Sequence, residues 1–260
     1  MIKFKIMSLF KSGNPTLSEN KFRDTVIQIG TNEETMSLKG TLNKFGFLFL
    51  MVMATAFYVW NEASVGNNVQ GFMLGGAIGG FVLALVLMFK PVWAQFLAPA
   101  YALLEGLVIG AISALYNNAF AKVAPGIVMQ AVVLTFGTAI AMYFLYSFRI
   151  IRVTERFRSI MFAAIGGIAL FYFITFILSL FGVHVQGLQG GSMLSIGISV
   201  AITVIAALSL LMDFDRIEQG TAMGAPKYME WYCAFGLLVT MVWLYVEILR
   251  LLGNIYGRRD

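Results

Sequence analysis

Seven long apolar runs dominate this 260-residue sequence. Each run is close in length to the roughly 20 mostly apolar residues that cross the hydrocarbon core of a bilayer as a helix. Lipid offers backbone N–H and C=O groups no hydrogen-bond partner, so runs of this kind must be helical. The predicted spans are Leu42–Trp60, Gly71–Phe89, Phe96–Tyr116, Val123–Phe148, Ile160–Gly182, Met193–Met212 and Trp231–Leu252.

Composition favours the same class, an all-α polytopic membrane protein. Hydrophobic residues make up 59% of the chain and charged residues 12%, about half the charged share of an ordinary soluble domain. The connections between the runs are too short to hold a soluble domain. We therefore expect two parts: residues 1–40 as a polar cytoplasmic or interfacial arm, and residues 41–260 as one seven-helix membrane domain.

Lysine and arginine residues indicate the orientation. The N-terminal arm carries six of them, and the alternate connections that follow carry most of the others. Short cytoplasmic loops are enriched in these residues, so we expect the N-terminus in the cytoplasm. The net charge of +5 is then a topology signal, and no nucleic-acid partner is expected.

Small residues mark the expected contacts between helices. The second run contains GGAIGG, Gly75 to Gly80, and the third run contains Gly106 and Gly110. Glycines four residues apart lie on one face of a helix and let two backbones approach closely.

The sequence gives no support to an enzyme. It contains one histidine and one cysteine, and neither HExxH nor GxSxG occurs. A catalytic triad or a Cys/His metal cluster cannot be assembled from these residues, and no resident cofactor is expected.

Three carboxylates lie where lipid disfavours charge. Glu105 lies inside the third run, Asp213 at the end of the sixth, and Glu247 deep in the seventh. A charge at the centre of a bilayer costs about 2.5–3.5 kcal/mol, so such groups face the interior and are paired, protonated or hydrated. These properties suit a proton sensor or a cation site. By contrast, Asp215, Glu218 and Glu230 are expected to be ordinary charges at the level of the lipid headgroups.

A purely structural interpretation remains open for Asp213 and Glu247. Arg216 and Arg250 follow them by three residues, and each could form a local ion pair. Asp213 and Asp215 are two residues apart, so at most one of them is expected to face the core. If both helices run straight, Asp213 and Glu247 differ in height by about 15 Å, and Glu105 becomes the natural partner of Glu247.

The segments YALLEGLVIG (101–110), LLMDFDRIEQG (210–220) and WLYVEILRLL (243–252) resemble the Bax inhibitor-1 family, in particular its bacterial YccA/YetJ-like subgroup. The resemblance implies a seven-helix bundle with the last helix central, in the bacterial cytoplasmic membrane. It also implies a pH-sensitive calcium leak. Asp213 and Glu247 match the acidic pair that forms a closed, proton-sensing contact in that family.

Two functions follow as hypotheses. The first is a pH-sensitive cation leak, for Ca²⁺, in which Asp213 and Glu247 sense protons and bind the ion transiently, while Glu105 and Asp215 assist along the pathway. The second is a membrane protein that transports nothing and modulates a membrane protease or a stress response through a protein partner. Deleting residues 1–35 should abolish only partner control, whereas neutralising Glu247 should abolish only flux.

Overall fold

The computed structural model describes residues 34–182 and 192–258, so most of the predicted arm, residues 1–33, lies outside the described residues. Within the described part, seven helices are long and apolar enough to cross a membrane, which confirms the all-α, seven-span prediction. They are α2 (Leu38–Ser64), α3 (Gln70–Phe89), α4 (Ala94–Ala119), α5 (Ile127–Ser147), α6 (Glu155–Leu180), α7 (Met193–Ala222) and α8 (Met229–Tyr256), with a short 3₁₀ helix, η1 (Pro91–Trp93), before α4.

The ends of the helices follow ordinary capping chemistry. Ser37, Thr154 and Ser192 precede α2, α6 and α7, and each side chain accepts a hydrogen bond from a backbone N–H of the first turn. Gly224, just after α7, has φ +67°, which the reversal into α8 requires and which glycine adopts without strain. The sixth span was predicted to end at Met212; α7 continues to Ala222 because the polar residues beyond Met212 are held by partners within the protein.

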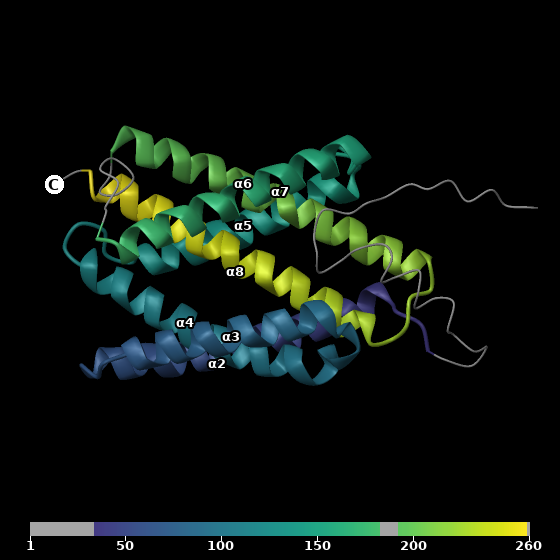
Figure 1. Ribbon diagram of the computed structural model, residues 1–260, viewed down its shortest axis with the longest axis horizontal. Coiled ribbons are helices and arrows are strands. Elements are labelled where there is room, and N and C mark those ends of the chain that lie inside the picture. Colours follow the sequence, from purple (N-terminus) through teal and green to yellow (C-terminus); the bar gives the residue numbers. More distant parts are fainter. Residues whose placement is uncertain (1–33, 183–191, 259–260) are drawn as a thin grey trace, which may run out of the picture.

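Helix α8 runs between two groups of helices (Figure 1). It packs against α2 and α4 on one side and against α5 and α7 on the other. The first group is completed by α3, which packs on α4, and the second by α6, which packs on α7. Among these spans α8 is the most buried and α6 the least.

Glycines bring the helices of the first group close together. A Cβ atom at Gly106 of α4 would lie 1.9 Å from Thr55 Oγ1 and 2.4 Å from the carbonyl oxygen of Val52, both on α2. On α3, a Cβ atom at Gly76 would lie 2.6 Å from the carbonyl oxygen of Leu104 on α4. The glycine spacing in the sequence therefore predicted real helix contacts.

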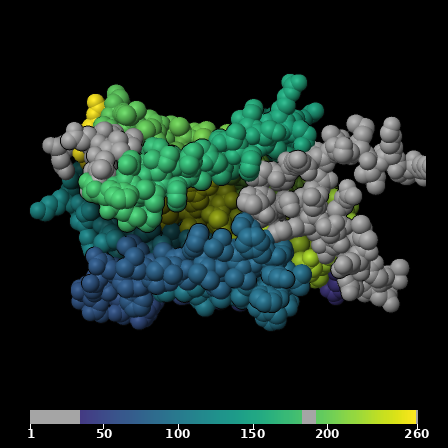
Figure 2. Space-filling model, in the orientation of Figure 1, coloured from purple at the N-terminus to yellow at the C-terminus, as the bar shows by residue number. Residues whose placement is uncertain are grey.

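One face of the membrane domain is hollowed. Figure 2 shows a depression between the blue helices of the first group and the green helix α6, with α8 at its floor. Part of α8 is therefore visible from this face, between the two groups of helices.

Candidate functional site

Glu247 lies in the core of the bundle, on α8, and is 1% exposed. Its Oε1 atom accepts hydrogen bonds from the Tyr172 hydroxyl at 2.9 Å and from the Trp243 indole N–H at 3.2 Å. The Arg250 guanidinium lies 3.4 Å from Oε2, hydrogen-bonds the Tyr172 hydroxyl and stacks over the Tyr172 ring. The local Glu247–Arg250 pair is thus present, and Tyr172 adds a link to α6 that the spacing of residues could not predict.

Asp213 is also buried, at 4% exposed, on the side of α7 that faces α8. The nearest guanidinium nitrogen of Arg216 lies 3.8 Å from Oδ1, so the predicted local pair is present but long. Among the described residues, Oδ2 has no hydrogen-bond partner within normal geometry. A buried carboxylate oxygen without a partner is costly, and such an oxygen can accept a bond from water or ligate a cation.

Asp215 is buried as well, which the sequence did not lead us to expect. Its Oδ2 atom is bound by Arg158 of α6 and accepts a hydrogen bond from Gln219 at 2.9 Å. Both carboxylates are enclosed because α7 has a neighbour on each side. Asp213 faces α8, and Asp215 faces α6. The prediction that at most one of them faces the core was wrong. Glu218 is half-exposed and paired with an exposed arginine, as expected for a headgroup-level charge.

Glu105 lies apart from the other acids. It is partly buried on α4, one turn after Tyr101, and a Cβ atom at Gly80 of α3 would lie 3.7 Å from its Oε2 atom. Within the described residues, the hydrogen bonds and ion pairs of Glu247 involve neither Glu105 nor Asp213. The structure therefore places the four predicted site residues in four separate polar environments.

Two of these groups share a structural role. Glu247 is linked to α6 through Tyr172, and Asp215 is linked to α6 through Arg158. One attachment is near the start of α6 and the other lies further along it. Buried carboxylates of the two most buried helices thus hold the least buried helix in place.

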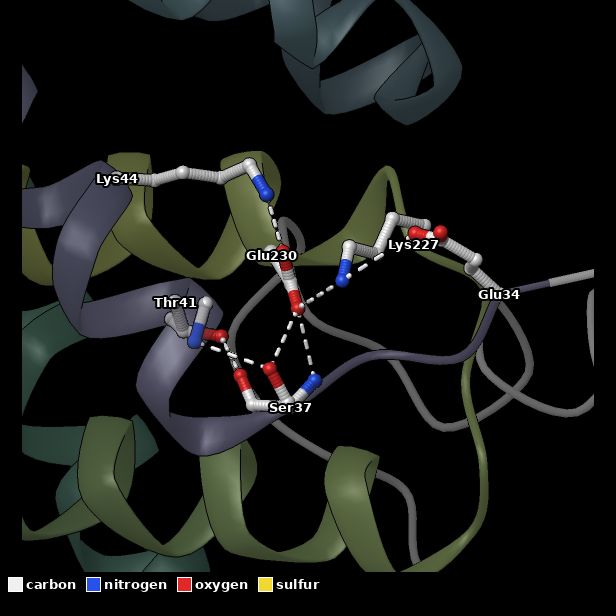
Figure 3. Close-up of polar contacts among 7 residues, drawn as sticks. Glu34, Ser37, Thr41, Lys44, Lys227 and Glu230 are labelled. Atoms are coloured by element: carbon white, nitrogen blue, oxygen red, sulfur yellow. Dashed lines mark hydrogen bonds and ion pairs between the residues drawn. The ribbon is translucent and has the colours of Figure 1, made fainter.

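The most complete polar cluster surrounds Glu230, in the first turn of α8 (Figure 3). One carboxylate oxygen accepts hydrogen bonds from the backbone N–H and the hydroxyl of Ser37, both at 2.9 Å, and lies 3.3 Å from Lys227 Nζ. The other oxygen is bound by Lys44 of α2. Glu230 is 0% exposed, so the prediction of an ordinary headgroup-level charge was wrong.

The backbone strengthens this attachment, which we call the Glu230 clamp (Ser37, Lys44, Lys227 and Glu230). Thr35 forms an antiparallel bridge with Pro226, and the N–H of Met36 donates to the carbonyl of Ala225 at 2.7 Å. Gly40 leaves room for the carboxylate, because a Cβ atom there would lie 2.1 Å from Glu230 Oε1. The start of α2 is therefore fixed to the turn between α7 and α8.

Sequence reasoning missed the Glu230 clamp for a simple reason. Ser37 before an apolar run is a visible capping signal, and Glu230 in a first helical turn suits the helix dipole. Neither signal says that the two residues meet, because they lie 193 positions apart.

Comparison with known proteins supports the likeness seen in the three motifs. The family model described as Bax inhibitor 1 like matches residues 14–257, which is nearly the whole chain. The chain belongs to this family. A search of the curated proteins finds no match. Membership of the Bax inhibitor family and the seven apolar helices together identify an integral membrane protein.

Proposed function

We propose that this protein is a pH-sensitive leak for cations, in particular Ca²⁺, in which the buried carboxylates gate the pathway. The observation that carries the proposal is the position of Glu247. It is buried in the most buried span and accepts a hydrogen bond from Tyr172 of the least buried span. A change in the charge of this carboxylate therefore acts directly on the span with the smallest buried share.

The chemistry of the site suits this role. Deprotonated carboxylates are hard oxygen ligands of the kind that Ca²⁺ prefers, and the Oδ2 atom of Asp213 has a free acceptor site among the described residues. When Glu247 binds a proton, it loses its attraction for Arg250 and gains an O–H donor, so the contacts that hold α6 must rearrange. Asp213 and Glu247 then act as two separate sensors on neighbouring helices, with Asp215 and Glu105 assisting.

The orientation is part of the proposal. The α3–α4, α5–α6 and α7–α8 connections lie at the end of the bundle where α2 begins (Figure 1). Lys90, Arg149, Arg152 and Lys227 are all at this end. Positive charge at one end supports a cytoplasmic N-terminus, and we propose the bacterial cytoplasmic membrane as the location.

Within the Glu230 clamp, Lys227 is a poor candidate for the pH sensor. The hydrogen bond that Lys227 donates to Glu230 raises the pKa of Lys227 above its usual value. A lysine with a raised pKa keeps its proton, and the stability that it contributes, at every pH below about 10.4, the value of an unperturbed lysine. Lys227 therefore stays charged between pH 6 and pH 8, and a response in that range does not come from Lys227.

Calcium flux into proteoliposomes between pH 6 and pH 8 tests the proposal. We expect wild-type flux to rise with pH, because the deprotonated carboxylates attract the ion. Glu247→Gln keeps an acceptor for Tyr172 but cannot gain or lose a proton, so its flux should vary less steeply with pH, with Asp213 as the remaining sensor. Tyr172→Phe should alter the pH dependence while leaving the carboxylate in place.

Two matched controls separate gating from general damage. Thr175→Val removes a hydroxyl from α6 whose hydrogen bonds all lie within its own helix, and Glu218→Gln neutralises a half-exposed acid. Both should behave as wild type. If wild-type protein that elutes as a folded species gives no flux above empty liposomes, the leak proposal is wrong, and the interaction hypothesis should be tested next.

A further inference from the structure

A pocket of about 300 Å³ lies where α5 turns into α6 beside α7. Its lining comes from the end of α5, the connection to α6 and one residue of α7. The lining residues are Tyr146, Arg149, Ile151, Arg152, Val153 and Asp215. Apart from Asp215, the residues that line this pocket have no part in the proposed leak.

The charges around the pocket favour an anion over a cation. The Oδ2 atom of Asp215 is already engaged by Gln219 and by Arg158, which also pairs with Glu155. Arg149 is paired with Glu218 at 2.7 Å. Arg152 is exposed and has no ion pair with a described residue. The wall of the pocket therefore carries one guanidinium group without an ion pair to a described residue, that of Arg152, and a second one, that of Arg149, which pairs with Glu218.

The backbone and the side chain of Arg149 are both held in place at the wall of the pocket. It has φ +56° and is the one described non-glycine residue in the left-handed region, which side chains other than glycine rarely adopt. Its guanidinium lies over the Tyr146 ring, 5.7 Å from the centroid, and the Tyr146 hydroxyl bonds the same Glu218 carboxylate. A disfavoured backbone held by its surroundings is a common feature of ligand sites.

The surroundings of the pocket indicate where its ligand comes from. Phe148 and Ile150, in the same connection, are 70% and 66% exposed, as expected of side chains that contact lipid. Helix α5 ends and helix α6 begins here, so the pocket opens at the depth at which an apolar span gives way to headgroups. A planar guanidinium matches the oxygens of a phosphate group with two parallel hydrogen bonds.

We propose that this pocket binds a phosphate group, supplied by the headgroup of an anionic phospholipid. Arg152 provides the free positive charge, Arg149 the second donor and Tyr146 the aromatic wall. Phe148 and Ile150 lie against the first part of the acyl chains. Basic pockets between transmembrane helices bind anionic headgroups in this manner. The proposal does not depend on the leak function.

Native mass spectrometry of the full chain, released from nanodiscs of mixed phosphatidylglycerol and phosphatidylcholine, tests this site. We expect wild type to retain phosphatidylglycerol selectively. Arg152→Gln should retain about tenfold less, the loss expected for a hydrogen bond to a charged group. Arg156→Gln is the matched control, because Arg156 is also exposed, lies four residues away and does not line the pocket.

The outcomes are distinct. Selective loss in Arg152→Gln, with Arg156→Gln unchanged, supports the site. Equal loss in both variants would mean that only overall charge attracts the lipid, and the proposal would be wrong. Millimolar inorganic phosphate distinguishes the two sources of the phosphate group. If phosphate displaces the retained phosphatidylglycerol from wild type, the phosphate group of the lipid is the part that is bound. If wild type binds inorganic phosphate but retains no phosphatidylglycerol, the lipid is not the ligand and the proposal is wrong.

Discussion

Replacing Glu230 with alanine is expected to destabilise the folded protein by about 3–5 kcal/mol, the usual effect of removing one partner from a buried ion pair. Lys44, whose side chain is 18% exposed, would lose its counter-ion. The backbone N–H and hydroxyl of Ser37 would lose their acceptor. The midpoint of thermal unfolding in detergent, followed by tryptophan fluorescence, should fall by an amount on the order of 10 °C.

Two further variants make this prediction specific. Glu230→Gln keeps an oxygen for Ser37 but loses the charge that binds Lys44, so its midpoint should lie between those of wild type and Glu230→Ala. Glu218→Gln removes an acid whose partner, Arg149, is 61% exposed, and exposed pairs contribute less than about 1 kcal/mol. Equal midpoints for Glu230→Ala and Glu218→Gln would show that the Glu230 clamp contributes no stability.

Replacing Gly106 with leucine is expected to separate α2 from α4. Even the first carbon of the new side chain would lie 2.4 Å from the carbonyl oxygen of Val52. That oxygen belongs to the backbone and cannot rotate away, so one helix must shift. Overpacking usually costs about 1–3 kcal/mol, and a backbone clash belongs at or above the upper end of that range.

Gly137→Leu is the matched control for this substitution. Gly137 lies in the middle of α5, and a Cβ atom there would meet nothing within 4 Å. We expect its thermal midpoint and its elution from a sizing column to match wild type, whereas Gly106→Leu should elute earlier or aggregate. The same loss in both variants would mean that leucine is disfavoured in these helices for a reason other than the α2–α4 contact.

The spans could be predicted from the sequence because a membrane imposes one length and one polarity on each of them. The Glu247–Arg250 and Asp213–Arg216 pairs could be predicted for a related reason, since residues three apart lie on the same face of any helix. The length of α7 could not, because it depends on Asp215 and its neighbours finding partners inside the protein.

Contacts between distant segments account for what the sequence did not reveal. Tyr172 and Glu247 are 75 residues apart, and Lys44 and Glu230 are 186 apart. Periodicity identifies the face on which each of these residues lies but does not say which helices are neighbours. The tyrosine on α6 was therefore missed, and Glu230 was assigned to the headgroup level although it is more completely enclosed than Glu105.

The Glu230 clamp has a consequence for how the chain is made. At the usual 5–20 residues per second, Ser37 leaves the ribosome roughly 10–40 s before Glu230 does, since 193 residues separate them. Throughout that interval Lys44 is without the counter-ion that Glu230 provides in the folded protein. The start of α2 is thus fixed to the turn between α7 and α8 only after that turn and the first turn of α8 have been made. Nascent chains that stop short of α8 lack this contact, and they are the form that quality-control proteases should degrade.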